Sequence, residues 1–338
     1  MQFFVGGYGK DSLHRCEYGP AGMKILETYE TENASYLCMS PDRKYLYAAV
    51  ENENGCIAAF SVEDDGKLCY LGNDSTGGRF PCYVSVSGNK LYAANYGSGS
   101  TVIFNIETIF DEHVDIEHID LYQPLLLYHN RFGTPSKAVA GRQDSPHAHY
   151  IQPIQIGERV TAWACDLGLD AVLIFDGQGE MLKYIEMPRG FGARHIAFGH
   201  KQPIAYVVGE LAQAVLAIKY DEALNITVSG PVPIFETPAH GTCAAIRVSP
   251  DGRLLVSNRG TNAISVLKLK ENGEIAGIES IFMLEGDCPR DFTFTPDGKK
   301  VFVAYQKSDF IEVFEWNNGL ISTGERLTIQ KPTCIAIP

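Results

Sequence analysis

Six segments of the chain repeat one pattern at a spacing of about 45–50 residues, a period typical of repeat folds. Each reads as an apolar run, a polar turn, a second apolar run, another polar turn and a third apolar run. A clear copy is CAAIRVSPDGRLLVSNRGTNAISVL at 243–267, and the others cover 34–60, 81–104, 146–175, 193–218 and 289–314. Because this period accommodates four short strands, the repeat predicts the blades of an all-β propeller.

The two ends of the chain complete a seventh copy. KPTCIAIP at 331–338 reads as a first strand cut off at its turn, and MQFFVGGYG at 1–9 reads as the second strand that follows. We therefore predict a single domain over residues 1–338, a seven-bladed β-propeller with four strands per blade and a last blade closed by both termini. This closure removes the open sheet edge between the first and last blades. A six-bladed ring with frayed ends is the alternative.

One interval, 105–145, fits the repeat poorly and is predicted to be a long inter-blade loop. VDIEHIDLYQ at 114–123 reads as the outer strand of the second blade, and PLLLYHNRFGTPSKAVAGRQDS at 124–145 as the loop itself. Loops of this length are commonly functional or mobile. Because the loop leads directly into PHAH at 146–149, we expect it to cover a site there; a disordered surface excursion is the alternative.

Composition limits the partners of the protein. The net charge of −13 would repel a phosphate polymer or an anionic membrane, so we expect neither nucleic acid nor membrane as a partner. The chain has no apolar run of the roughly 18 residues that a membrane span needs. The nine cysteines include no C-x-x-C pair, which favours reduced, buried thiols. The N-terminus has no basic region to indicate a signal peptide, so we expect a cytoplasmic protein. We also expect a monomer or a weak homo-oligomer.

Propeller geometry brings two sets of side chains to one mouth of the central axis. In each blade the first two strands are antiparallel, so the start of the first and the end of the second meet there. Aligning the repeats, the column at the first-strand start contains Ser35, Cys82, His147, Arg194, Ala244, Arg290 and Thr333. The column at the second-strand end contains Tyr8, Glu51, Tyr96, Asp166, Glu210, Arg259 and Gln306.

Arginines and carboxylates therefore converge at this mouth although the protein is acidic. The guanidinium of arginine matches carboxylate and phosphate groups, so we expect a small anionic ligand. A solvated channel without a function is the alternative. His149 should face the same side as His147, one step deeper. A zinc site on His147 and His149, with Asp166 or Glu210 as third ligand, is a further alternative. We predict no metal, because the arginines would repel a divalent cation.

At these positions the sequence resembles a known family. SPHAHY, ARHIAF, SNRG and PRDFTFTPDGK, in this order along the whole chain, are similar to motifs of the seven-bladed propeller lactonases. This family includes bacterial propeller-type 6-phosphogluconolactonases and fungal 3-carboxy-cis,cis-muconate lactonizing enzymes. The resemblance implies a metal-independent enzyme for small anionic lactones. We also expect no cofactor, because the sequence offers no motif that would hold one. The functional residues that the resemblance implies are His147, Arg194, Glu210 and Arg259, with the choice between His147 and His149 left open.

The leading hypothesis is hydrolysis of 6-phosphogluconolactone to 6-phosphogluconate, a reaction of the pentose phosphate pathway in carbohydrate metabolism. Glu210 or His147 would act as general base, and an arginine would stabilise the oxyanion. Arg290 would hold the phosphate. The other residues expected to contact substrate are Asp166, Tyr96, Gln306, Glu51 and His149. The alternatives are a carboxymuconate cycloisomerase on the same fold and a non-catalytic propeller that serves as a binding platform.

Overall fold

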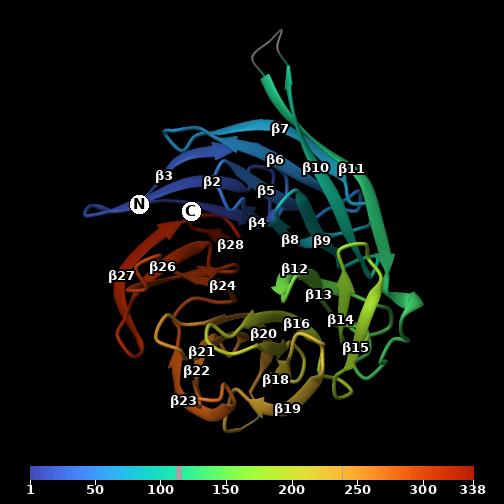
Figure 1. Ribbon diagram of the computed structural model, residues 1–338. Helices are drawn as coiled ribbons and strands as arrows, with labels where there is room; N and C mark the ends of the chain where they lie inside the picture. The colour runs from blue at the N-terminus through green and yellow to red at the C-terminus, as the bar shows by residue number, and fades with distance from the viewer. Residues whose placement is uncertain (112–115, 238) are drawn as a thin grey trace.

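The computed structural model describes residues 1–111, 116–237 and 239–338. The described residues form seven four-stranded antiparallel sheets arranged in a ring around a central axis (Figure 1). Each sheet is one blade, so the predicted seven-bladed propeller is confirmed. The strands of a blade follow one another from the axis to the rim, which places the start of every blade near the centre of the ring.

Six blades are built from consecutive strands. From the axis outward they are β4 (Ala34–Met39), β5 (Tyr45–Val50), β6 (Cys56–Val62) and β7 (Leu68–Ser75); β8 (Pro81–Ser87), β9 (Lys90–Asn95), β10 (Ser100–Asp111) and β11 (Ile116–Tyr128); β12 (Ala148–Ile156), β13 (Arg159–Asp166), β14 (Ala171–Asp176) and β15 (Met181–Glu186); β16 (Ala193–Phe198), β17 (Ile204–Gly209), β18 (Ala214–Tyr220) and β19 (Ile226–Pro233); β20 (Gly241–Val248), β21 (Leu254–Gly260), β22 (Ala263–Leu269) and β23 (Ile275–Met283); β24 (Pro289–Phe294), β25 (Lys300–Tyr305), β26 (Phe310–Trp316) and β27 (Leu320–Thr328). A short 3₁₀ helix, η1 (His129–Arg131), follows β11.

The seventh blade contains both ends of the chain. Its strands, from the axis outward, are β28 (Pro332–Ala336), β1 (Gln2–Gly7), β2 (Leu13–Gly19) and β3 (Gly22–Tyr29). The last strand pairs with the first, with Ile335 opposite Val5 and Cys334 opposite Gly6. The predicted closure by the two termini is therefore confirmed, and the N and C ends lie close together in Figure 1.

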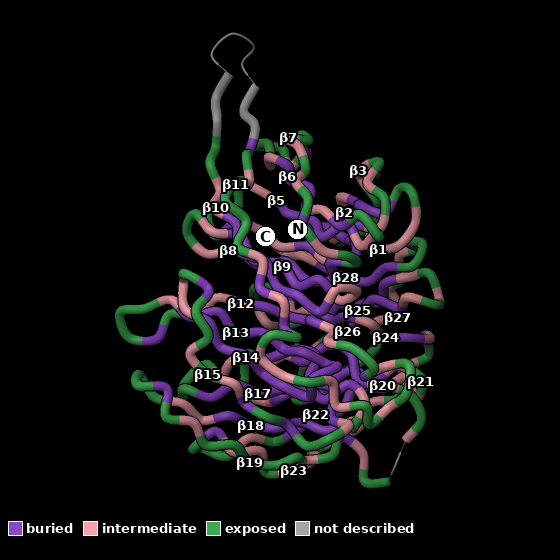
Figure 2. The backbone as a smooth tube through the Cα atoms, turned by 90° about the vertical axis from the view of Figure 1, so that its right-hand side faces the viewer, coloured by how far each residue is buried: buried purple, intermediate pink, exposed green. Residues whose placement is uncertain are grey.

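The core lies between the blades, around their inner strands. All six residues of β17 are buried, whereas most of the rim strand β19 of the same blade is exposed. Seen from the side, buried segments fill the middle of the molecule and exposed segments lie at its margins (Figure 2). Aromatic rings join neighbouring blades; Phe3 of β1 contacts Phe302 of β25 with ring centroids 5.1 Å apart. Because fully burying such a side chain is worth about 1.5–3 kcal/mol, these interfaces hold the inner strands in fixed positions.

The interval 105–145 contains less loop than the sequence suggested. β10 continues to Asp111 and β11 runs from Ile116 to Tyr128, so the two form a hairpin that extends beyond the ring (Figure 1). The first two residues of the outer strand predicted at 114–123 lie outside the described residues. Pro124, the first residue of the predicted loop, falls at a bulge in this edge strand, where a missing backbone N–H is tolerated. The connecting loop is shorter than predicted and covers 132–147.

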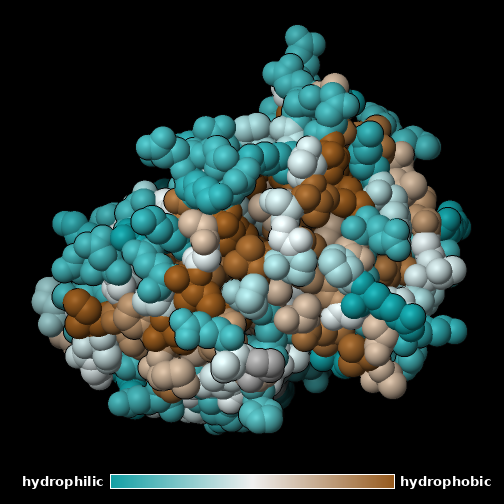
Figure 3. All heavy atoms as spheres, turned by 90° about the horizontal axis from the view of Figure 1, so that it is seen from below, coloured by the Kyte–Doolittle hydropathy of each residue, from teal (hydrophilic) through white to brown (hydrophobic). Residues whose placement is uncertain are grey.

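The outside of the molecule is mixed in character. Seen from below, hydrophilic residues dominate the outline, and hydrophobic residues are exposed between them toward the middle of the view (Figure 3). Among the described residues, there is no helix with the length and hydropathy that crossing a membrane would require.

We expect the last strand to be essential for stability. Deleting residues 332–338 removes the partner of β1 and opens the innermost edge of the terminal blade. The loss should far exceed the roughly 1 kcal/mol of an average point mutation, so cooperative thermal unfolding should disappear or shift down by more than about 10 °C. Deleting only Pro338, which lies beyond β28, is the control and should change the melting temperature little. A deletion variant that melts within 2 °C of the parent, a shift of order 1 kcal/mol or less, would contradict the closure.

Candidate active site

A β-bulge recurs at the axial end of the inner hairpins. In six blades one residue of the first strand is left out of the pairing ladder at this point. A bulge re-aims the side chain of the extra residue, which is why bulges are common beside active sites. All six extra residues lie at the axis, where they line a small chamber: Ser35, Cys82, His149, Arg194, Arg290 and Thr333.

This register places His149, rather than His147, in the first-strand column. Repeat alignment matched His147 with Cys82, but the ladder skips Cys82 in one blade and His149 in the other. The tyrosine that follows each of them, Tyr83 and Tyr150, is the sequence signal that would have given the correct alignment.

His147 itself lies beside the pocket. Its ring stacks on Tyr96 with centroids 4.4 Å apart and an angle of 14° between the planes. Its Nδ1 is 2.9 Å from the Tyr96 carbonyl oxygen, and its Nε2 is 3.3 Å from Ser145 Oγ. Both ring nitrogens therefore have partners, the Tyr96 carbonyl oxygen and the Ser145 hydroxyl.

Asp166 is displaced from the second-strand column by one residue. It pairs with Ala148, and the equivalent pair in the next blade is Gly209 with Ala193, so the counterpart of Glu210 is Leu167. Because a shift of one residue moves a side chain to the other face of a strand, Asp166 is fully buried behind the pocket. The location of Asp166 gives no support to its predicted contact with substrate.

The axial pocket has a volume of about 170 Å³ and is lined almost entirely by polar side chains. Seven of the predicted site residues line it: Glu51, Tyr96, His149, Arg194, Glu210, Arg259 and Arg290. His147, Asp166 and Gln306 do not, although Gln306 accepts a hydrogen bond from Arg290 Nη1 at 3.2 Å. The pocket also contains Tyr8 and Cys82, which were in the two columns, and Arg142, which was not.

Glu210 is the centre of the charge network. Its Oε2 lies 2.6 Å from Arg194 Nη1 and 3.1 Å from Arg259 Nη2, and its Oε1 lies 2.5 Å from Arg142 Nη2. Burial by itself would raise the pKa of Glu210, but Arg259 and Arg194 lower that pKa well below its usual range. The carboxylate is therefore ionised at neutral pH and poorly suited to accept a proton.

A second polar cluster occupies the opposite wall. Arg290 Nη2 donates to the Tyr8 hydroxyl at 3.0 Å, and that hydroxyl donates to Glu51 Oε2 at 2.8 Å. Burial alone would lower the pKa of Arg290, but Tyr8 and Glu51 raise it, while burial raises the pKa of Tyr8. Arg290 thus stays charged and Tyr8 stays protonated.

His149 lies between these clusters at the bottom of the pocket. Its Nε2 contacts Arg194 Nη1, and its Nδ1 is 3.7 Å from Cys82 Sγ. Burial, followed by the charge of Arg194, lowers the pKa of His149 well below its usual value. Burial also lowers the pKa of Arg194 to about 10, against the opposing effect of Glu210. At pH 7 the pocket thus presents a neutral imidazole beside a charged guanidinium.

Arg142 is the pocket residue that repeat analysis missed. It comes from the loop at 132–147, which has no counterpart in the other repeats. The one available signal was that this loop leads directly into the axial strand β12, which led us to expect it over a site.

The charges that line the pocket do not balance. Four arginines face two carboxylates, which leaves two positive charges in excess inside a protein of net charge −13. Within the described part of the chain, no group of three or more histidine, cysteine or acidic side chains is arranged to hold a metal ion. The arrangement is suited to binding a small anion and to stabilising negative charge that develops beside His149.

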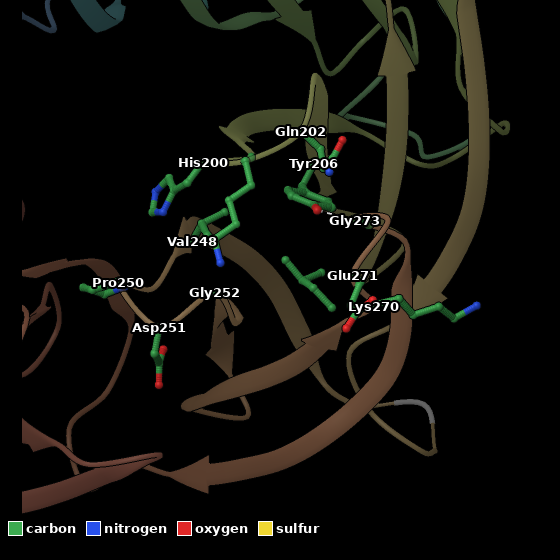
Figure 4. A pocket seen from close by; sticks show the side chains of 13 residues that line it. His200, Gln202, Tyr206, Val248, Pro250, Asp251, Gly252, Lys270, Glu271 and Gly273 are labelled. Carbon is green, nitrogen blue, oxygen red and sulfur yellow. Dashed lines mark hydrogen bonds between the residues drawn. The ribbon is translucent and has the colours of Figure 1, made fainter.

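A second hollow lies between two neighbouring blades, away from these groups. It has a volume of about 370 Å³ and is formed by turns that include His200, Pro250 and Glu271 (Figure 4). Two of its charged residues pair with neighbours, Asp251 with Arg253 and Lys270 with Glu274. It lacks the convergence of buried charges that marks the axial pocket.

Comparison with known proteins agrees with this architecture. The family described as "Lactonase, 7-bladed beta-propeller" matches residues 2–337. An uncharacterized protein of Staphylococcus aureus is 32% identical over 334 residues, which cover 93% of this chain and 92% of that protein.

Two solved structures share the whole fold. One, from Bacteroides uniformis, carries a provisional assignment as a 6-phosphogluconolactonase; its TM-score is 0.84 at 25% identity, covering 99% of this chain and 98% of that chain. The other is the periplasmic gluconolactonase PpgL of Pseudomonas aeruginosa, with a TM-score of 0.86 at 22% identity, covering 100% and 99% of the two chains.

Fold and pocket together define a seven-bladed propeller with a cationic axial site. The family match extends over nearly the entire chain. The protein belongs to the seven-bladed β-propeller lactonase family.

Replacing Glu210 by glutamine should strongly destabilise the protein. Glu210→Gln keeps the shape but leaves Arg194 and Arg259 without their counter-charge. Breaking one side of a buried ion pair costs about 3–5 kcal/mol, which urea denaturation would measure. The matched control is Glu279→Gln, which removes the partner of Arg253 at the surface and should cost about 0–1 kcal/mol. Equal stabilities of the two variants would show that Glu210 does not hold the arginines.

Stability should also decrease in mild acid. Burial is the main cause that lowers the pKa of both His149 and His195, so both are neutral in the folded state. An unfolded chain binds these protons near pH 6.5, so the free energy of unfolding should fall as the pH drops below that value, by up to about 1.4 kcal/mol per pH unit for each histidine. His195→Phe should reduce this slope, and substitution of the exposed His200 by glutamine should not. An unchanged slope in His195→Phe would refute the assignment.

Proposed function

We propose that the protein hydrolyses a small anionic sugar lactone, and that 6-phosphogluconolactone is its substrate. The observation that carries this proposal is the excess of arginines around a neutral histidine in a small pocket. Membership of the lactonase family supports the reaction class, and the provisional assignment of the Bacteroides uniformis structure supports the substrate.

His149 is proposed as the general base. Of the two bases that the sequence suggested, His147 lies beside the pocket and Glu210 is held ionised by arginines. In the empty pocket His149 Nε2 accepts from Arg194 Nη1. When the lactone carbonyl takes over this guanidinium N–H, Nε2 would be free to take a proton from water as the water oxygen attacks the carbonyl. The negative charge of the substrate would raise the proton affinity of His149, which is low in the empty pocket.

Arg194 and Arg259 are proposed to stabilise the oxyanion that forms at the carbonyl carbon. Both are fixed by Glu210, and Arg194 contacts His149, so guanidinium and base lie side by side. Preorganised donors of this kind contribute about 3–4 kcal/mol each to a barrier. When the intermediate collapses, the ring C–O bond breaks and the proton on His149 passes to the leaving alkoxide.

Glu210 is proposed to position the arginines, not to transfer protons. Tyr8 and Glu51 would contact substrate hydroxyl groups from the opposite wall, where Arg290 holds Tyr8. The cytoplasmic location, the place in the pentose phosphate pathway and the monomeric or weakly oligomeric state remain predictions.

The test is acid release from 6-phosphogluconolactone by chelator-treated protein. The parent should be active, since the mechanism uses no metal. His149→Gln should lower kcat by about 10²–10⁴-fold, the usual contribution of a general base. His147→Gln should cost less than about tenfold, because His147 does not line the pocket and its ring nitrogens bond to the Tyr96 carbonyl and to Ser145.

A larger loss in His147→Gln than in His149→Gln would overturn the assignment of the base. The carboxymuconate substrate of the related cycloisomerases is the control. If the parent converts carboxymuconate and not the sugar lactone, the proposed function is wrong and the cycloisomerase alternative is correct.

A further inference from the structure

Arg142 differs from the other arginines of the pocket in its position. The side chain of Arg194 is 3% exposed and that of Arg259 is 15% exposed, whereas that of Arg142 is 35% exposed. Arg142 also contacts Tyr96 at the edge of the pocket. Arg194, the least exposed of the three, contacts His149. Arg142, the most exposed, therefore lies toward the opening, where the part of a ligand remote from the reacting carbonyl would be.

Gln143, the residue after Arg142, holds this part of the loop in place. Gln143 is fully buried, and its Nε2 donates to Asp170 Oδ1 at 2.6 Å and to the Leu167 carbonyl oxygen at 2.8 Å. Asp170 Oδ1 also accepts the backbone N–H of Gly192 at 2.6 Å, which ties Gln143 to the blade that contains Arg194. A buried amide held in this way fixes the backbone of its neighbour.

Both ends of the loop at 132–147 are held by Asp166. Asp166 Oδ2 lies 2.7 Å from Nδ1 of His129, just before the loop, and Oδ1 accepts the backbone N–H of His147 at 2.9 Å. The other ring nitrogen of His129 is 3.2 Å from Thr101 Oγ1, and all three side chains are fully buried. The sequence predicted Asp166 in the pocket. It instead holds both ends of the loop that carries Arg142.

These contacts hold the loop at 132–147 in a fixed position. This loop, called the strap below, is therefore not a lid that opens and closes. We propose that Arg142 is the residue that selects substrates carrying an anionic group remote from the lactone carbonyl, and that Gln143 and Asp166 hold it in place for this purpose. This inference rests on the proposed function and adds a subsite for a phosphate or carboxylate. Arg142 donates to Glu210 and to Tyr96, and a guanidinium has five N–H groups, so further donors are available to the ligand.

The position of Arg142 also assigns different tasks to the arginines. Arg290 was expected from the sequence to hold the phosphate, but it already donates to Tyr8 and Gln306. Arg142 has one carboxylate partner, Glu210, which it shares with two other arginines. Its remaining donors can form the paired hydrogen bonds that phosphate oxygens favour.

The experiment compares 6-phosphogluconolactone with unphosphorylated gluconolactone in Arg142→Ala, Arg142→Lys and the control Arg131→Ala. Arg131 is exposed in η1, before the loop at 132–147, and its guanidinium lies over the Tyr128 ring. Arg142→Ala should raise KM for the phosphorylated lactone by about 10–100-fold, the loss expected for charged hydrogen bonds, with kcat changed by less than about threefold. The unphosphorylated lactone should respond little, and Arg131→Ala should behave as the parent.

Arg142→Lys should recover part of the preference, because it keeps the charge but not the paired donors. Gln143→Leu tests the anchor: it should reduce the phosphate preference without a change in kcat, and adding it to Arg142→Ala should cause no further loss of preference. An additive loss would show that Gln143 does not act through Arg142.

Calorimetric binding of inorganic phosphate separates this inference from the proposed function. If the parent hydrolyses the phosphorylated lactone and Arg142→Ala keeps its full preference, the inference is wrong and the function stands. If neither lactone is hydrolysed but phosphate binds to the parent and to Arg131→Ala and not to Arg142→Ala, the subsite stands and the function is wrong.

Discussion

The carboxylate of Glu210 is the group on which the axial pocket depends. A buried guanidinium such as that of Arg194 needs a counter-charge, and several arginines around one small space would otherwise repel one another. Glu210 satisfies Arg194, Arg259 and Arg142 together, since its two oxygens reach all three. It neutralises only part of their charge, however, so the pocket remains attractive to an anion. The same residue therefore supports both the stability of the pocket and its binding preference.

The propeller places this network by repetition. The bulge at the start of six inner strands directs one side chain per blade toward the axis, whatever that side chain is. Ser35 and Thr333 occupy such positions without adding charge, whereas His149, Arg194 and Arg290 place there the side chains to which the proposed function assigns roles. Tight packing between the blades keeps these positions fixed, and the mouth is then completed by the strap that carries Arg142.

The repeats were sufficient to predict the fold, because hydrophobic periodicity and turn spacing are properties of the sequence alone. They also selected Arg194, Glu210 and Arg259. The bulge at Arg194 recurs in other blades, so it does not disturb the alignment of the copies. They failed where register depends on tertiary structure. The third blade has two more residues between Pro146 and Tyr150 than the second blade has between its proline and tyrosine. Counting from the proline therefore selected His147 instead of His149. A shift of one residue likewise moved Asp166 to the other face of its strand.

Arg142 could not have been found in this way, because its loop belongs to no repeat. Its position follows from long-range contacts of buried polar groups, such as that of Gln143 with Asp170, which neither propensity nor spacing encodes. Pro124 was similarly misleading, since only the bulge in the edge strand makes it compatible with β11. The errors thus share one cause: local patterns do not determine which irregularity the tertiary structure will accept.

A crystal structure with the product 6-phosphogluconate would test the central claim most directly. The account predicts the product in the axial pocket, with its carboxylate between Arg194 and Arg259 next to His149 and its phosphate toward Arg142. Binding of the product outside this pocket, for example in the hollow beside His200 and Pro250 (Figure 4), would contradict the account. So would a reversed orientation, with the phosphate beside His149.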